Sequence, residues 1–333
     1  DRILKKILDG YHSGDHDGVV LADALDDERS QDWFCIKTNS DRQVLQVYGH
    51  PRPHYVDHRL MGIFAIRTKD LRSAVASKPG IMLNVNVGAM PHLEAEFEQS
   101  IQSLIDKGKN IYMIDADNEA VDMDKPWHIM EANQRFTQYE VGTLTDNLID
   151  ATAHIHPSAH IAGKVVLGKD VKIGKNVVIE GNVVIGDRTV IDNGAIIGAN
   201  TVIGHDSIVK NYCQIGEHSV IGNHNRFGHA AEFQGVTFDH VSFMHFGEVY
   251  GVIGAFTDIA AGVTVGNLRF DDLNQVHHIH GRREEPNQFG NAVFIGDYTR
   301  TGINNILLPG IKIGTNCAIG PGVMVEEDVP SKS

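Results

Sequence analysis

A period of six residues is the feature of this sequence that most restricts its fold. From Ile155 to Phe233 every sixth residue is apolar. Six fits neither the 3.6-residue turn of a helix nor the two-residue alternation of a strand. It is typical of a hexapeptide β-helix, in which short strands end at sharp turns and successive coils stack. The series is Ile155, Ile161, Leu167, Ile173, Ile179, Ile185, Ile191, Ile197, Ile203, Val209, Ile215, Ile221, Phe227 and Phe233.

The same period predicts how the coils stack. If three hexads close one coil, residues eighteen apart form ladders such as Ile155, Ile173 and Ile191. A buried large aliphatic side chain contributes about 1.5–3 kcal/mol, whereas ordering each residue of a hexad costs roughly 1–2 kcal/mol. One hexad therefore cannot stand alone, and only stacked coils offset the entropy. We predict an all-β, left-handed parallel β-helix of hexapeptide repeats over residues 151–333.

Residues 1–150 predict a different class of structure. Helices are indicated at 1–13, 68–77, 92–107 and about 127–139, and strands at 18–25, 60–67 and 110–115. Residues 33–38 and 43–48 have the pattern of a β-hairpin. Strands that alternate with helices are typical of an α/β domain. The sequence thus predicts two domains, residues 1–150 and 151–333.

Composition excludes some classes of partner. Lys and Arg number 29 against 43 Asp and Glu, a net charge of −14, which argues against nucleic acid and anionic membranes. The sequence has no signal peptide and no apolar run long enough to span a bilayer. Cys35, Cys213 and Cys317 form no disulfide framework, so a cytoplasmic location is expected. Because the chain begins at Asp1 rather than Met, we expect the natural protein to start further upstream.

Several stretches resemble a known family. Residues 41–67 (DRQVLQVYGHPRPHYVDHRLMGIFAIR) and 109–133 (KNIYMIDADNEAVDMDKPWHIMEAN) resemble the substrate-side half of a sugar-1-phosphate nucleotidylyltransferase. NLRFDD (267–272) and FGNAVFIGDYTRTGINNILLPGIKIG (289–314) add to the likeness. Together with the β-helix, the chain resembles the bifunctional N-acetylglucosamine-1-phosphate uridylyltransferase/glucosamine-1-phosphate acetyltransferases of the archaeal type. The first domain would then be a partial, Rossmann-like nucleotidyltransferase domain.

The resemblance implies an incomplete nucleotidyl site. The family's glycine-rich phosphate loop and its first metal-binding aspartate have no counterpart, and its second metal-binding aspartate corresponds to Asp122. Mg²⁺ is usually held by one or two carboxylates together with substrate phosphates, so Asp122 alone is an incomplete site. The family's Glu-Lys-Pro reads Gly49-His50-Pro51, and a histidine replaces the lysine charge poorly at pH 7. We do not expect nucleotidyl transfer, and Asp122 with Asp124 can equally form a solvated turn.

The six-residue phase is interrupted at 234–252 and 268–292. Loops on a rigid scaffold often carry sites, so we expect both segments to do so. The resemblance implies that His245, in FMHFG, is the general base that deprotonates a sugar amine. It also implies that Asn267 contacts the substrate. The lysine and tyrosine of the family pattern are replaced here by Gln234 and Glu248, which leaves Tyr250 as the nearest tyrosine.

The remaining candidates bind substrate or coenzyme. Arg269, Arg282 and Arg283 form a cationic cluster in an acidic protein and are candidates for phosphate groups. The other implied substrate residues are Glu232 and Tyr250. Acetyl-CoA would lie along coils whose small side chains allow close approach, at Ala260, Ala261, Gly302 and Ala318.

Three alternatives stay open. His277, His278 and His280 are possible metal ligands or part of an exposed loop. His224 and His229 have the spacing of the zinc-binding γ-type carbonic anhydrases, although Arg188 falls where a third histidine is expected. The run 282–285 is either a phosphate site or a self-paired, solvated loop.

Two functions follow from these observations. The first is an enzyme that N-acetylates an amino-sugar 1-phosphate with acetyl-CoA. The family's acyl site lies between neighbouring β-helices, so a homotrimer is implied, and Mg²⁺ would be required only by a complete nucleotidyl site. The second is a non-catalytic trimeric scaffold that binds a sugar phosphate or a nucleotide sugar.

Overall fold

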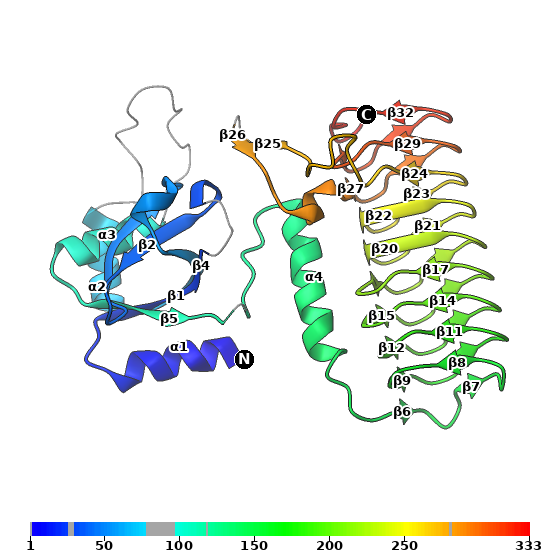
Figure 1. The fold of residues 1–333 in the computed structure, drawn as a ribbon, viewed down its shortest axis with the longest axis horizontal. Helices are drawn as coiled ribbons and strands as arrows, with labels where there is room; N and C mark the ends of the chain where they lie inside the picture. Colours follow the sequence, from blue (N-terminus) through cyan, green and yellow to red (C-terminus); the bar gives the residue numbers. More distant parts are fainter. Residues whose placement is uncertain (1, 26–29, 78–96, 118, 280–281) are drawn as a thin grey trace. The chain divides into compact units, whose positions relative to one another are not determined.

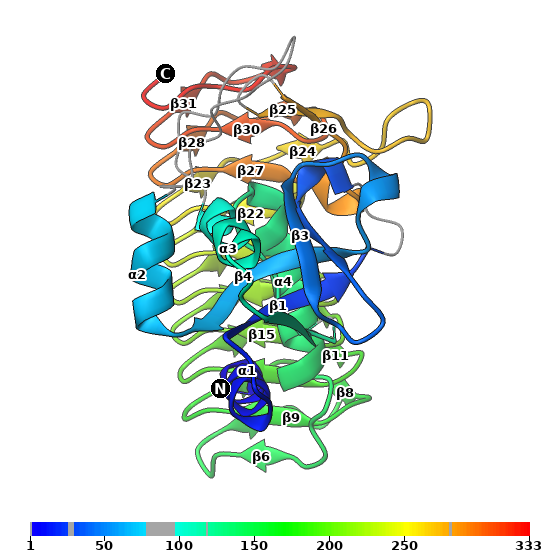
Figure 2. The same ribbon diagram turned by 90° about the vertical axis from the view of Figure 1, so that its left-hand side faces the viewer.

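The computed structural model describes residues 2–25, 30–77, 97–117, 119–279 and 282–333. The chain divides into two compact units, Asp1–Asp122 and Met123–Ser333. Figure 1 and Figure 2 show their elements. In this part of the chain, no helix is both long and apolar enough to cross a bilayer.

The first unit is built on a five-stranded sheet in the order β3-β2-β4-β1-β5. The predicted α/β class is confirmed, but the sheet is mixed, because among the described strands of this sheet only β1 and β5 pair in parallel. It therefore lacks the mainly parallel sheet of a Rossmann-like domain. Of the helix predicted at 92–107, residues 92–96 lie outside the described residues. The elements are α1 (Arg2–Ser13), β1 (Gly18–Ala24), η1 (Ser30–Asp32), β2 (Phe34–Thr38), β3 (Val44–Gly49), η2 (Pro53–Tyr55), β4 (His58–Ile66), α2 (Thr68–Ser77), α3 (Phe97–Asp106) and β5 (Ile111–Asp115).

The second unit is a three-sided parallel β-helix, which confirms the prediction from the six-residue period. The first face contains β7 (His154–Ile155), β10 (Lys172–Ile173), β13 (Val190–Ile191), β16 (Ile208–Val209), β19 (Arg226–Phe227), β21 (Ser242–Phe243), β23 (Asp258–Ile259), β28 (Arg300–Thr301) and β31 (Ala318–Ile319). The second contains β8 (His160–Ile161), β11 (Val178–Ile179), β14 (Ile196–Ile197), β17 (Gln214–Ile215), β24 (Thr264–Val265), β29 (Ile306–Leu307) and β32 (Met324–Val325). The third contains β6 (Leu148–Ile149), β9 (Val165–Leu167), β12 (Val183–Ile185), β15 (Thr201–Ile203), β18 (Val220–Ile221), β27 (Val293–Ile295) and β30 (Lys312–Ile313).

The predicted ladders form the core of the β-helix. Ile173 pairs with Ile155 on one side and with Ile191 on the other, so residues eighteen apart do stack. Each strand leads into a corner, which we call first, second or third after the face that precedes it. Corner residues adopt a left-handed conformation, for example Tyr212 at φ 60° and His224 at φ 56°. This repeated backbone aligns corner side chains of successive coils in columns.

The sequence predicts a loop at 234–252, and this prediction is wrong. Strands β20 (Glu232–Thr237) and β22 (Glu248–Ile253) each run from the second face into the third without a corner turn. Phe233 pairs with Val249, so these coils contain sixteen residues instead of eighteen. Gly235 makes this continuous strand possible at φ 139°, because a Cβ there would lie 2.0 Å from the carbonyl oxygen of Gly251. The phase slip in the sequence is thus a shortened coil.

The segment 268–292 does leave the β-helix, as predicted. The chain departs after β24 and returns at β27, which pairs with β22. The excursion includes the antiparallel pair β25 (His277–Ile279) and β26 (Arg282–Glu284), and the short helix η3 (Gln288–Asn291).

Helix α4 (Pro126–Glu140) belongs to the second unit. Its Trp127 and Met130 pack in one apolar cluster with Val236 and Val252 of the shortened coils. Its Thr137 hydroxyl lies 2.8 Å from His218 Nδ1. The structural division therefore falls after Asp122 rather than near residue 150, since the apolar side of this helix is buried against the β-helix.

Candidate functional site

The first corner brings His245 beside His229 of the preceding coil. The two imidazole rings stack with centroids 4.8 Å apart and an interplanar angle of 21°. Phe246, which follows His245, lies edge-on to both rings. His245 is half-buried. The shortened coil produces this pairing, because it places residues sixteen apart in the same column.

A cavity of about 520 Å³ opens at this corner. Two cationic side chains face it, Lys210 and Arg226, and no carboxylate lines it. Lys210 Nζ lies 3.8 Å from Asp192 Oδ2, so its charge is only loosely compensated. The cavity is therefore a positive site in an acidic protein, suited to a phosphate group. Its lining residues are Lys210, Asn211, Tyr212, Arg226, Gly228, His229, Met244 and His245.

Three of the four predicted coenzyme residues lie on the coils that follow His245 at this corner. The amide of Gly262 donates to the carbonyl of His245 at 3.1 Å, which places Ala261 directly next in the column. Ala260 precedes it, and Gly302 occupies the same corner one coil further. A Cβ on Gly302 would lie 2.4 Å from the nitrogen of Pro321, so coil packing alone requires this glycine. Ala318 lies on the first face in β31.

The structure does not bring Asn267 to the first corner of its own chain. Asn267 is exposed and follows β24 at the second corner, whereas His245 precedes β22 at the first. Glu232 is exposed at the start of β20. Tyr250 packs into the apolar cluster under α4, and burial raises the pKa of its phenol to about 12. Within one chain, Asn267, Glu232 and Tyr250 therefore lie on other surfaces of the β-helix than His245.

The predicted arginine cluster is internally paired. Arg269 holds both carboxylate oxygens of Asp271, at 2.9 and 2.6 Å. Arg283 pairs with Glu285 at 2.9 Å and is 64% exposed. Arg282 lies in β26, and its side chain is outside the described residues. These contacts favour the self-paired loop over a preformed phosphate site.

His277 is a packing residue. Its ring is buried against Trp127 at 4.5 Å, and its Nε2 lies 2.8 Å from the carbonyl of Gly290. Its Nδ1 lies 3.1 Å from Lys312 Nζ, so neither nitrogen is available to a metal ion. His278 is exposed, and His280 lies outside the described residues. For His277 both alternatives left open by the sequence are therefore wrong, the metal ligand and the exposed loop.

We expect acid to destabilise this part of the protein through His277. Burial, aided by the charge of Lys312, lowers the pKa of His277, so below about 6.5 the unfolded chain binds a proton that the folded chain resists. The contribution to stability is complete above that pH and is lost as the pH falls toward the lowered pKa. Each pKa unit of separation corresponds to about 1.4 kcal/mol. The melting temperature of His277→Gln should therefore fall less than that of the wild type between pH 7.5 and 5.5. His278→Gln serves as the exposed control and should behave as wild type, whereas equal falls in all three proteins would refute this role.

Asp122 has little support as a metal ligand. Burial raises the pKa of the nearby Glu98, and the negative charge of Asp122 adds to this shift. Burial opposes ionisation of Asp124, yet hydrogen bonds from His128 and Lys125 lower its pKa to about 2. Among the described residues, Asp122 belongs to no group of three possible metal ligands.

The zinc site suggested by His224 and His229 is not formed within this chain. His224 lies at the third corner, beside His205, whereas His229 lies at the first. Sequence reasoning missed the pocket residues Lys210 and Arg226, and it considered His229 only as a zinc ligand. Asn211 and His229 are eighteen residues apart, so the repeat could have predicted that they share a column. The repeat could not predict that His245, sixteen residues after His229, joins the same column.

A three-sided coil built from hexapeptide repeats defines the structural class of this unit, the hexapeptide-repeat β-helix. Residues 143–238 match the family described as GMPPB C-terminal domain, and residues 292–327 match the bacterial transferase hexapeptide (six repeats). Over 78 residues the chain is 40% identical to a bifunctional sugar-1-phosphate nucleotidylyltransferase/acetyltransferase of Sulfurisphaera tokodaii, a match that covers 23% of this chain and 20% of that protein. Over 108 residues it is 32% identical to the bifunctional protein GlmU of Methanococcus maripaludis, covering 32% of this chain and 26% of the relative.

The chain thus has homologues among archaeal bifunctional transferases, and the matches span about a fifth to a quarter of their length. The solved structure of the Francisella novicida UDP-N-acetylglucosamine acyltransferase superposes with a TM-score of 0.40 and 22% identity, over 55% of this chain and 64% of that chain. A superposition of this quality carries no argument about function.

Proposed function

We propose that the β-helix transfers the acetyl group of acetyl-CoA to the amine of an amino-sugar 1-phosphate. The observation that carries the proposal is the first-corner pocket, in which His245 lies beside two cationic side chains on a rigid solenoid. Homology to bifunctional sugar-phosphate transferases supports the same chemistry. Small residues follow His245 in the same column, where the thioester would approach.

In this reaction the sugar amine attacks the thioester carbonyl, an amide bond forms and the C–S bond breaks. The amine must lose a proton, and the coenzyme leaves as a thiolate that gains one. An imidazole suits both transfers near neutral pH, so we assign the base to His245. Its stacking on His229 and its contact with Phe246 hold the ring in place.

Lys210 and Arg226 are the proposed phosphate anchors. The family pattern has a lysine where this chain has Gln234, whose side chain hydrogen-bonds to the carbonyl of Glu217 at the second corner. A phosphate on the substrate therefore needs another cation near His245. Lys210 and Arg226 line the same cavity and supply two.

A homotrimer is the proposed assembly. Asn267 and His245 lie at different corners of one chain, so they meet only if neighbouring copies place these corners against each other. Sedimentation at micromolar concentration should find trimers, and a monomer alone would contradict the shared site. The buried free thiols of Cys35, Cys213 and Cys317 fit a reducing compartment, so we propose a cytoplasmic location.

The second candidate is a non-catalytic trimeric scaffold that binds a sugar phosphate or nucleotide sugar. It is favoured by Gln234 and Glu248 at the positions of the family's lysine and tyrosine, and by the burial of Tyr250. Thermal shifts with sugar nucleotide but not with acetyl-CoA would support the scaffold, because only a bound ligand stabilises the fold.

The assay that tests the enzyme is release of free coenzyme A from acetyl-CoA with a panel of amino-sugar 1-phosphates. In the double variant Lys210→Gln/Arg226→Gln, we expect the KM for the sugar phosphate to rise roughly 10- to 100-fold, because the substrate loses its charged hydrogen bonds to these two side chains. Activity toward the unphosphorylated sugar should not change. Lys172→Gln is the matched control, since Lys172 has the equivalent outward position on the first face three coils earlier. An unchanged KM in the double variant would remove these residues from the site.

A further inference from the structure

The third corner carries a second cluster of histidines and a carboxylate, away from the first-corner pocket. His205 and Asp206 occupy one coil, and His224 occupies the next. One possible ligand atom from each lies within 4.8 Å of the others, the only such group of three in the described ranges. His205 and His224 are exposed and Asp206 is half-buried, so an ion can reach all three from solvent.

The backbone fixes the spacing of the three side chains. The amide of His224 donates to the carbonyl of His205 at 3.0 Å, and the amide of Asp206 donates to that of Asp187 at 2.9 Å. Asp206 and His224 share the left-handed corner conformation at φ 56°. The ring of His224 is held between the stacked ring of His240 at 4.7 Å and the edge of His205 at 5.0 Å. The cluster therefore sits on a rigid part of the solenoid.

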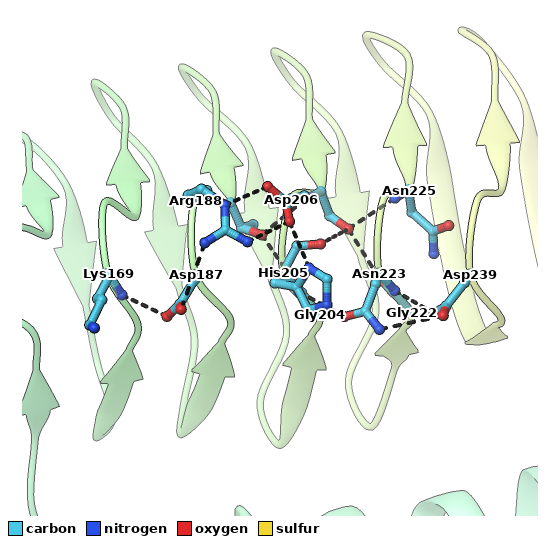
Figure 3. A network of polar contacts seen from close by, with 12 residues as sticks. Lys169, Asp187, Arg188, Gly204, His205, Asp206, Gly222, Asn223, Asn225 and Asp239 are labelled. Atoms are coloured by element: carbon cyan, nitrogen blue, oxygen red, sulfur yellow. Dashed lines mark hydrogen bonds and ion pairs between the residues drawn. The ribbon is translucent and has the colours of Figure 1, made fainter.

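Three hydrogen-bond contacts orient the carboxylate of Asp206. Figure 3 shows Arg188 and His205 on either side of it. Arg188 donates from Nε to Oδ1 and from its terminal nitrogen to Oδ2, each at 2.7 Å. His205 Nδ1 lies 2.7 Å from Oδ2.

We propose that His205, Asp206 and His224 bind one divalent transition-metal ion of the zinc class. Two imidazoles and one carboxylate are a donor set that suits zinc, copper or nickel, whereas Mg²⁺ and Ca²⁺ require oxygen ligands. Zinc ligands at about 2.1 Å in a tetrahedron lie roughly 3.4 Å apart. Rotation of the exposed side chains of His205 and His224 about the fixed carboxylate would reach this spacing, and a water would complete the site.

Arg188 does not bind the ion in this arrangement but holds the carboxylate of Asp206 that does. The ion replaces the proton between His205 Nδ1 and Asp206 Oδ2, and the imidazole proton moves to Nε2. Arg188 keeps its bond to Oδ1, since ligating carboxylates are themselves usually hydrogen-bonded. The ion then joins two successive coils at one corner. The site is independent of the acetyltransferase proposal.

Calorimetric titration of the chelator-treated full chain with zinc chloride tests the site. The wild type should bind one ion more per chain than His224→Ala, and Asp206→Asn should weaken that binding at least tenfold. His229→Ala is the matched control, because His229 and His245 also bring two imidazoles of successive coils together, at the first corner, where no carboxylate lines the cavity. It should bind as the wild type does. Magnesium chloride should give no heat of binding.

Cobalt(II) provides a second readout. The wild type should show the visible absorption of four-coordinate cobalt, and His224→Ala should lose it while keeping its melting temperature in the metal-free state. Equal zinc stoichiometry and affinity in the wild type and His224→Ala would overturn the proposal and leave the cluster as an ion-paired corner ladder. Loss of binding in His229→Ala alone would also overturn it.

Discussion

His245→Ala should lower acetyl-CoA-dependent turnover roughly 10²- to 10⁴-fold, the usual contribution of a general base. The effect should fall on kcat, because the pocket still holds the phosphate through Lys210 and Arg226. The measurement is release of free coenzyme A with the best amino-sugar 1-phosphate of the panel. His245→Gln should be equally slow, since an amide fills the space and makes hydrogen bonds but does not accept the proton.

His154→Ala is the control for this experiment. His154 is an exposed histidine of the first face, far along the coils in β7. Its replacement should leave turnover unchanged. Full activity of His245→Ala would exclude the proposed base. Absence of turnover in the wild type with every acceptor, in a protein that still forms trimers, would favour the scaffold function.

Phe227→Ala should cause the largest loss of stability, about 3–5 kcal/mol, because it leaves a cavity in a packed core. Phe227 is fully buried on the first face. Its ring lies 5.4 Å from that of Phe233 and 5.6 Å from that of Phe243. It therefore joins the last eighteen-residue coil to the first shortened one.

The guanidinium midpoint of unfolding measures this loss. Phe270→Ala is the control, because Phe270 is fully exposed in the excursion and its replacement should change stability by less than about 0.5 kcal/mol. A midpoint of Phe227→Ala equal to that of the wild type would mean that the aromatic cluster adds nothing to the stability of the β-helix.

Local and repetitive information determined most of the fold. Every inward residue from Ile155 to Phe233 is apolar, like its neighbour one coil away, because both face the same core. The period alone therefore predicted the strands, the faces and the ladders. The elements of the first unit were predicted for the same reason, since amphipathic helices and apolar strands show their period over a few residues. Likewise, the excursion at 268–292 interrupts the repeat for long enough to be recognised.

Long-range packing decided the rest. A two-residue slip after Phe233 is equally compatible with a loop and with a shortened coil, and only the pairing of Phe233 with Val249 distinguished them. The helix α4 was predicted as a helix, but its place on the β-helix depends on contacts with residues about a hundred positions later.

The sites show the same division. The sequence by itself singled out His245 and the small residues after it, because a family motif is a local string of residues. It did not reveal that His229, Lys210 and Arg226 share a cavity with His245, nor that His205, Asp206 and His224 converge at another corner. Such groupings depend on how many residues each coil contains, and coil length is fixed by the backbone hydrogen bonds between coils, which only the tertiary structure specifies.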